Sequence, residues 1–254
     1  MEIATHVAHI EQEARSFVTA AARGGLDAAV PSCPGWDVRE LVRHLSEIHL
    51  WAAAQVAGRA TQLWPDGLDE LATWWPELAV FWPDDDDLLD FYLATSDNLV
   101  RQLKDPPPDV DARTFLPAPT PLAMWARRQC HELTIHRVDA EQAAGVGSVI
   151  DPAVASDGID ELLMAFAPRA TETPLAAARC MVVDATDTGD RWSVTMGPEG
   201  IDTTRSDGRG DVRVSGSAVD LYRSLWNRGD ADVGVDGDPD VLAAWHANHH
   251  VRWS

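Results

Sequence analysis

Two histidines and one glutamate have the chemical types and the spacing to bind a divalent metal ion. Glu132 and His136 lie four residues apart in a helical pattern, so their side chains leave one face of the helix one turn apart. His44 comes from an earlier helical segment, at the edge of its apolar stripe. Such a set leaves an ion with an open position for water or sulfur, and zinc is its default metal, with nickel, cobalt or iron(II) compatible. Asp139, three residues after His136, is placed to orient that imidazole.

The same residues also have simpler interpretations. A lone buried histidine such as His44 usually hydrogen-bonds to a backbone carbonyl. The pair Glu132–His136 has a spacing common on helix surfaces, where it contributes about 0.2–0.5 kcal/mol. The dipeptide His131-Glu132 looks like the start of the HExxH zinc-protease motif, but that motif needs histidine where the sequence has Ile135. His131 and His136 are five residues apart, about 140° around a straight helix, so they cannot share one ion.

The segments that carry these residues belong to a helical first part of the chain. The apolar spacing predicts four principal helices, over residues 2–22, 38–57, 88–104 and 121–144, with a short helix near 67–80 in a long connection. Asp37 and Glu40 form a capping-box pattern before the second helix. Thr120 and Pro121 suit the start of the fourth helix. Four helices with one long crossover describe a four-helix bundle.

The second part of the chain contains short runs of alternating apolar and polar residues, which are typical of strands. The pattern predicts a helix near 154–166, strands at 180–184, 192–196, 211–214 and 233–235, and helices at 218–226 and from 239 to 245. We therefore predict an α+β protein, with a metal-binding four-helix bundle over residues 1–148 and a small α/β C-terminal domain over 149–254.

Composition narrows the classes of partner. The 254 residues include 20 Lys+Arg and 41 Asp+Glu, a formal net charge of −21. A field of this sign argues against nucleic acid and against an anionic membrane surface as partners. The first residues lack the pattern of a signal peptide, and three cysteines without a CxxC pair fit a reduced compartment, so a cytoplasmic location is expected. The sequence has no P-loop and no GxGxxG fingerprint in a strand–helix unit, which disfavours a nucleotide cofactor.

Three segments together resemble one known family. SCPGWDVRELVRHL, HELTIHRVDAEQAAG and DVRVSGSAVDLYRSLWNRGDADVGVDGDPDVLAAW are similar to corresponding parts of the mycothiol-dependent maleylpyruvate isomerase family, so the resemblance covers nearly the whole chain. It implies a DinB-like metal-binding four-helix bundle joined to a small α/β domain. The family's metal histidine falls on His44, and its Glu-x-x-x-His pair falls on Glu132 and His136.

The resemblance also implies a thiol cofactor, mycothiol, and a small electrophilic substrate similar to maleylpyruvate. A metal-bound thiol loses its proton near neutral pH and becomes a nucleophile. In the isomerase, the resemblance implies that the sulfur of mycothiol adds to a conjugated double bond. The bond, now single, rotates before the thiol leaves again. If the thiol does not leave, the outcome is transfer of the thiol to the electrophile. The motifs leave the choice between isomerase and transferase open.

Two arginines are candidate catalytic residues. A dicarboxylate substrate is naturally held by bidentate arginine, and Arg223 and Arg228 are candidates for this contact. The simpler interpretation is that both are solvated arginines. Three other functions stay open: a non-catalytic metal-binding or regulatory protein on the same fold, a metal hydrolase with water in the open position, and a degenerate, purely structural protein.

Overall fold

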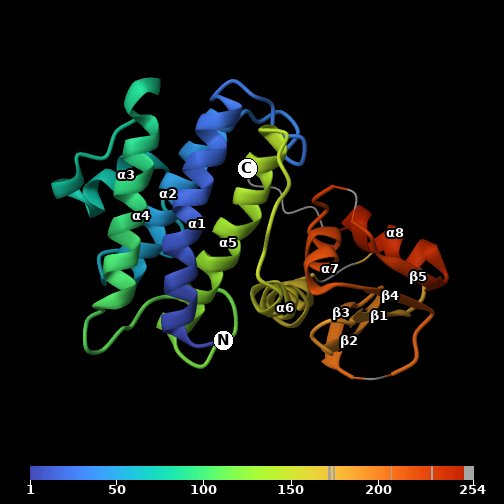
Figure 1. Cartoon of the computed structure of the whole chain (residues 1–254). Coiled ribbons are helices and arrows are strands. Elements are labelled where there is room, and N and C mark those ends of the chain that lie inside the picture. The colour runs from blue at the N-terminus through green and yellow to red at the C-terminus, as the bar shows by residue number, and fades with distance from the viewer. Residues whose placement is uncertain (171–172, 174, 207, 230, 249–254) are drawn as a thin grey trace. The chain divides into compact units, whose positions relative to one another are not determined.

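The protein folds as two compact units, Met1–Ser148 and Val149–Ser254. The computed structural model describes residues 1–254 except 171–172, 174, 207, 230 and 249–254. Figure 1 shows helices in the first unit and helices together with a β-sheet in the second. The predicted α+β fold class is confirmed. Among the described residues, no helix has the length and apolar character needed to cross a membrane.

Four long helices form the first unit. They are α1 (Ile3–Gly24), α2 (Val38–Val56), α4 (Leu88–Lys104) and α5 (Pro121–Ala143), close to the predicted ranges. The short helix α3 (Leu68–Trp74) and two 3-10 turns, Pro76–Leu78 and Asp85–Asp87, lie in the connection between α2 and α4. Both α1 and α2 pack against α4 and α5, so the four long helices surround one common core.

Local capping fixes where α2 and α5 begin. The Glu40 backbone N–H donates to Asp37 Oδ1 (2.9 Å), and the Asp37 N–H donates to Glu40 Oε2 (3.0 Å), which completes the predicted capping box. Thr120 Oγ1 accepts from the backbone N–H of Ala123 (3.1 Å) at the start of α5. These caps set the register of the two helices that carry the predicted metal ligands.

Helix α5 is buried over most of its surface, and its buried side chains include charged ones. Burying a charge is unfavourable unless a partner compensates it. Arg137 of α5 accordingly donates to Glu13 of α1 and, at 2.6 Å, to Glu141 of α5. Apolar side chains fill the rest of the interior, among them Ile10, Phe17, Leu41, Leu45, Leu99 and Leu133, all fully buried. The bundle therefore encloses a helix that brings polar chemistry into the core.

The second unit is built on a five-stranded sheet with the strand order β3-β2-β1-β4-β5. The strands are β1 (Arg179–Ala185), β2 (Arg191–Gly197), β3 (Gly200–Arg205), β4 (Val212–Gly216) and β5 (Gly234–Gly237). Strands β1 and β4 are parallel, and the other neighbouring pairs are antiparallel. The helices of this unit are α6 (Pro152–Glu161), α7 (Ala218–Leu225) and α8 (Pro239–Asn248).

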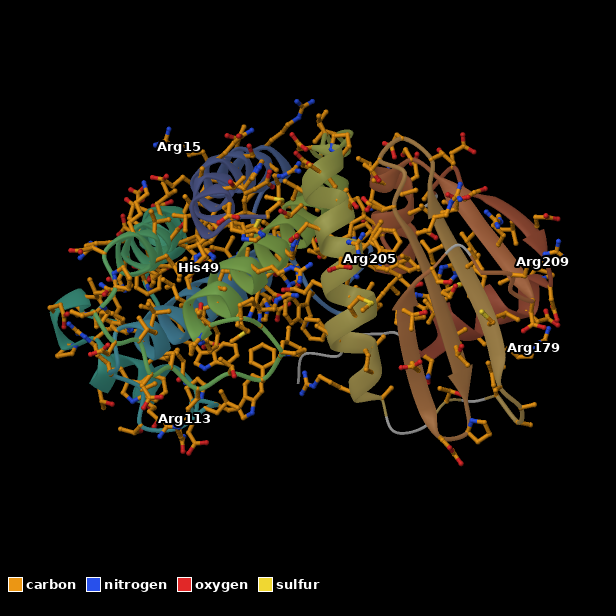
Figure 2. The ribbon with its side chains drawn as sticks, turned by 90° about the horizontal axis from the view of Figure 1, so that it is seen from below. Arg15, His49, Arg113, Arg179, Arg205 and Arg209 are labelled. Carbon is orange, nitrogen blue, oxygen red and sulfur yellow. The ribbon has the colours of Figure 1, made fainter. Side chains whose placement is uncertain are left out.

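Two parts of this unit differ from the sequence prediction. Strand β3 was not predicted, although it pairs with β2 along its whole length. Arg205 at the end of β3, labelled in Figure 2, donates to Asp160 of α6 (2.9 Å), as does the indole N–H of Trp192 (3.0 Å). The helix predicted to run to residue 166 ends as α6 at Glu161 and continues as a π-helical turn over Leu162–Phe166.

Candidate metal centre

Helices α2 and α5 bring His44, Glu132 and His136 together. His44 Nε2 and His136 Nε2 each lie 3.2 Å from the same oxygen, Glu132 Oε1. The two imidazole rings are nearly perpendicular, at 80°, with their centres 5.0 Å apart. One donor atom from each of the three side chains lies within 4.8 Å of the other two. Two imidazole nitrogens and one carboxylate oxygen are a donor set that suits zinc and related divalent ions, so these residues fit a metal.

The group is buried unequally. The side chains of His136 and Glu132 are 2% and 5% exposed, whereas that of His44 is 12% exposed. The Trp36 ring packs against His44 with a centroid distance of 5.1 Å. Within the helical unit, His44 is therefore the member of the group that solvent reaches most easily.

Arg128 fixes the second oxygen of Glu132. Its Nη2 donates to Glu132 Oε2 at 2.7 Å, one turn earlier on α5. Burial by itself would raise the pKa of Glu132, but the charge of Arg128 and the hydrogen bonds from the two histidines hold that pKa well below its usual range. The carboxylate is therefore ionised, with Oε2 held by the guanidinium and Oε1 facing the imidazoles.

Asp139 orients His136 from the other side of its ring. Its Oδ2 lies 2.8 Å from His136 Nδ1, and its Oδ1 accepts from the hydroxyl of Ser32 (2.5 Å). Cys33 Sγ lies 3.7 Å from the same carboxylate. The Nδ1 side of the ring therefore faces Asp139, and the Nε2 side faces Glu132 Oε1.

The two histidines respond in opposite ways to this environment. Burial would lower the pKa of His136, but hydrogen bonds with Asp139 and Glu132 outweigh burial and raise it. Burial is the largest effect on His44, and the pKa of His44 is lowered despite its hydrogen bond with Glu132. His44 is therefore the more readily neutral of the two imidazoles.

Family comparison places this geometry in context. Residues 7–141 match the family model described as the mycothiol maleylpyruvate isomerase N-terminal domain, and residues 153–244 match the MDMPI C-terminal domain. The chain belongs to the mycothiol maleylpyruvate isomerase family. A search among curated protein sequences finds no significant match.

Two solved structures resemble this member of the mycothiol maleylpyruvate isomerase family over most of its length. The crystal structure of the mycothiol-dependent maleylpyruvate isomerase has a TM-score of 0.60 at 15% identity and covers 93% of either chain. The crystal structure of a histidine-to-alanine mutant of the mycothiol-dependent maleylpyruvate isomerase has a TM-score of 0.61 at 14% identity, with the same 93% coverage of both chains. At such identities the likeness shows a shared fold.

The two arginines named from the sequence belong to the second unit of this family member. Arg223 lies on α7, and none of the described groups hydrogen-bonds to its buried Nε. Arg228 follows α7, and its Nη1 donates to the Trp226 carbonyl (2.8 Å). The three candidate ligands lie in the helical unit, whereas both arginines lie in the second unit. A role of the arginines in catalysis therefore stays a prediction.

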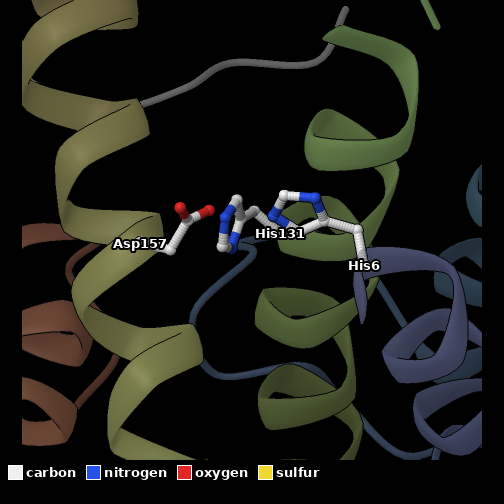
Figure 3. Close-up of side chains that lie close together, drawn as sticks. All are labelled: His6, His131 and Asp157. Carbon is white, nitrogen blue, oxygen red and sulfur yellow. The ribbon is translucent and has the colours of Figure 1, made fainter. Parts of the chain in front are cut away.

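His131 takes part in a different contact. It is fully buried and meets His6 of α1, with ring centroids 6.0 Å apart and an angle of 75° between the ring planes. Figure 3 shows these two side chains, which come from α1 and α5. His131 therefore faces α1, in agreement with the argument that it cannot share an ion with His136.

Sequence reasoning missed two supports of the candidate centre. The pairing of Arg128 with Glu132 had a signal, because the two residues have the i, i+4 spacing of a helical ion pair. The hydrogen bond from Ser32 to Asp139 had no signal in the sequence, because it joins residues 107 positions apart. It depends on how the turn before α2 meets α5.

Proposed function

We propose that this protein is a metal- and mycothiol-dependent enzyme that acts on a small electrophilic substrate, as an isomerase or as a thiol S-transferase. The observation that carries the proposal is the convergence of His44 Nε2 and His136 Nε2 on Glu132 Oε1, at 3.2 Å each, inside a chain of this family. The name of the family and of the similar crystal structures supports mycothiol as the thiol. Maleylpyruvate-like compounds are the substrate class that those names suggest.

His44, Glu132 and His136 would hold the metal. A divalent ion with an open position supplies a Lewis acid that lowers the pKa of a coordinating thiol. Zinc is the first candidate by donor type, followed by nickel, cobalt and iron(II).

The surrounding residues prepare these ligands. Arg128 keeps the Glu132 carboxylate charged and restricts its rotation by holding Oε2. Asp139 holds the proton of His136 at Nδ1, which leaves Nε2 as the ligand nitrogen. Ser32 holds Asp139 in turn. The exposed edge of the group at His44 is the side from which a thiol could approach.

Arg223 and Arg228 are the proposed carboxylate-binding residues. Their guanidinium groups offer donors in the geometry that a carboxylate accepts, and the net charge of −21 means that an anionic substrate needs such local positive charge. In kinetic terms, we expect Arg223→Lys or Arg228→Lys to raise KM for a dicarboxylate substrate more than for its monoester.

Metal analysis is the first test of the proposal. The purified protein should contain about one divalent ion per chain, and His44→Ala, Glu132→Gln and His136→Ala should each lose most of it. Alanine at His9, an α1 histidine outside the group, is the matched control and should retain the metal. A Glu132→Gln variant that retains full metal content would show that the ligand assignment is wrong.

Thiol binding is the second test. Titration of the metal-loaded protein with mycothiol should show saturable binding that is lost with the metal. Bound metal without thiol affinity would favour a regulatory metal-binding protein. Activity that survives complete removal of thiols would favour a hydrolase that uses water as the nucleophile.

A further inference from the structure

A second group of metal-binding side chains meets at the other ring nitrogen of His136. Cys33 Sγ lies 3.7 Å from Asp139 Oδ2, and the same oxygen lies 2.8 Å from His136 Nδ1. One donor atom from each of these three side chains lies within 4.8 Å of the other two. Glu132 lies on the opposite edge of the ring, next to Nε2. The imidazole of His136 is therefore placed between two sets of ligand atoms.

The turn before α2 holds Cys33 at this position. The backbone N–H of Cys33 donates to the Val30 carbonyl (3.1 Å), and the N–H of Trp36 donates to the Cys33 carbonyl (3.0 Å). The neighbouring Ser32 donates to Asp139 Oδ1, which ties the turn to α5 and leaves Oδ2 for the other two members of the group. Cys33 is partly exposed, whereas Asp139 is fully buried, so solvent reaches the group most easily at Cys33.

The distances in the group are close to those around a tetrahedral metal ion. Bonds of about 2.3 Å to sulfur and about 2.0–2.2 Å to nitrogen or oxygen place neighbouring ligand atoms about 3.4–3.6 Å apart. The separation of Cys33 Sγ and Asp139 Oδ2 is 3.7 Å. His136 Nδ1 and Asp139 Oδ2, at 2.8 Å, would move apart by about 0.6 Å when an ion replaces the hydrogen between them. Modest side-chain rotation therefore suffices to bring these atoms to bonding distance of one ion.

The charges of the group suit a divalent ion. A cysteine binds metal as the thiolate, so Cys33 and Asp139 together supply two negative charges. A neutral imidazole adds none, and a divalent ion would therefore leave this buried group without net charge. Glu132 Oε1, 3.2 Å from His136 Nε2, can accept the proton that the ring then carries on that nitrogen. The sulfur ligand favours thiophilic ions such as zinc over magnesium or calcium.

We propose that Cys33, Asp139 and His136 form a second cation site, which binds a thiophilic divalent ion through Sγ, Oδ2 and Nδ1. The site shares His136 with the first group but needs neither His44 nor Glu132. Because a neutral imidazole has one acceptor nitrogen, an ion at this site competes for His136 with an ion at Nε2. The Cys33 thiol gives its proton to solvent as the bond from sulfur to the ion forms. The inference goes beyond the proposed function and depends on neither mycothiol nor a substrate.

Cadmium is the probe for this site, because it prefers sulfur ligands and its NMR resonance moves strongly downfield when sulfur is bound. The test uses the full-length Glu132→Gln protein, in which the first group lacks its carboxylate, without any added thiol. This protein should bind about one cadmium ion per chain and show the resonance of a sulfur-bound ion. Adding Cys33→Ser should abolish that resonance and weaken cadmium binding by more than about tenfold, since even supporting residues of metal sites have effects of this size.

Matched variants separate this site from other cysteines and from the first group. Cys180→Ser, at a partly exposed cysteine of the second unit, should leave cadmium binding to the Glu132→Gln protein unchanged. His44→Ala should keep the sulfur-bound resonance, whereas His136→Ala should lose it. The His44→Ala protein also replaces Glu132→Gln as the background if circular dichroism shows that Glu132→Gln is unfolded.

Two results would overturn the inference. The first is the absence of sulfur-bound cadmium in a folded protein that lacks only His44 or Glu132. The second is a sulfur-bound resonance that survives Cys33→Ser or His136→Ala, because the ion would then be held elsewhere. Zinc content and mycothiol affinity of the wild type report on the proposed function, so the two proposals can fail independently.

Discussion

Glu132 stands at the centre of its site because three side chains contact it at once. Arg128 holds one carboxylate oxygen, and the two histidines face the other. All of these groups are buried or nearly so, which makes the carboxylate dependent on its partners. The residue types and the i, i+4 spacing allow the three candidate ligands to be predicted from the sequence. The sequence pattern of α2 and α5 could not show that both nitrogens point to the same oxygen.

Arg128→Met tests this dependence. It leaves the ionised Glu132 buried without its cation, so we expect the metal-free protein to lose about 3–5 kcal/mol of unfolding free energy. Saturating zinc should restore part of that loss, because the ion supplies positive charge to the same carboxylate. Chemical denaturation with and without zinc measures both effects. Arg101→Met, at an exposed position on α4, should change stability by less than about 0.5 kcal/mol. A similar loss in both variants would contradict the argument.

His49 gives the fold a specific pH dependence. Its pKa is about 3 in the folded protein and about 6.5 when unfolded, so the unfolded chain binds more protons between these values. The stability that comes from burying neutral His49 is complete above about pH 6.5 and is lost as the pH falls toward 3. Between pH 7.5 and pH 5 the wild type should lose about 2 kcal/mol more than His49→Phe does. Denaturation of both proteins at the two pH values measures this difference, and parallel pH profiles would refute it.

At the scale of elements, α5 combines two roles that usually belong to different helices. It is buried like a core helix, yet it carries the charged residues Arg128, Glu132 and Arg137. Helix positions could be predicted because caps and breakers mark their ends, as the capping box of Asp37 and Glu40 does. Strand β3 was missed because Gly200–Arg205 is short and has one large apolar residue, Ile201. Its pairing with β2, and the parallel pairing of β1 with β4, depend on tertiary contacts that local patterns do not encode.

Asp37→Ala tests the capping box at the start of α2. The substitution removes the acceptor for the Glu40 N–H and for Arg39 Nη1, 3.0 Å away, and should cost about 1 kcal/mol of unfolding free energy. His44 lies two turns into the helix, so the metal content of the folded variant should stay near that of the wild type. Thr120→Ala, which removes the cap of α5, should have a comparable effect. Loss of metal without loss of stability would mean that Asp37 acts on the site directly.

At the scale of the whole molecule, the candidate ligands and the candidate arginines divide between the two units. His44, Glu132 and His136 lie within Met1–Ser148, whereas Arg223 and Arg228 lie within Val149–Ser254. The helical unit has its own core and its own set of ion pairs, as an independently folding domain does. The family assignment, which rests on segments of both units, could be made from the sequence because those segments are distinctive.

A fragment of residues 1–148 tests the autonomy of the helical unit. We expect it to fold with helical circular dichroism and to bind about one divalent ion, because all three candidate ligands are retained. It should have no turnover if Arg223 and Arg228 contribute to the substrate site. Metal analysis, circular dichroism and an activity assay beside the full chain provide the measurements. A fragment that folds but binds no metal would show that the second unit supplies a ligand.

His44 and Glu132 are 88 residues apart in the sequence and meet between two helices. An ion held by both would close a long loop, as a disulfide does in a secreted protein, and such closures restrict the unfolded chain most when the loop is long. Unlike a disulfide, this link would open whenever the ion departs. The melting temperature of the protein would then rise and fall with the free metal concentration around it.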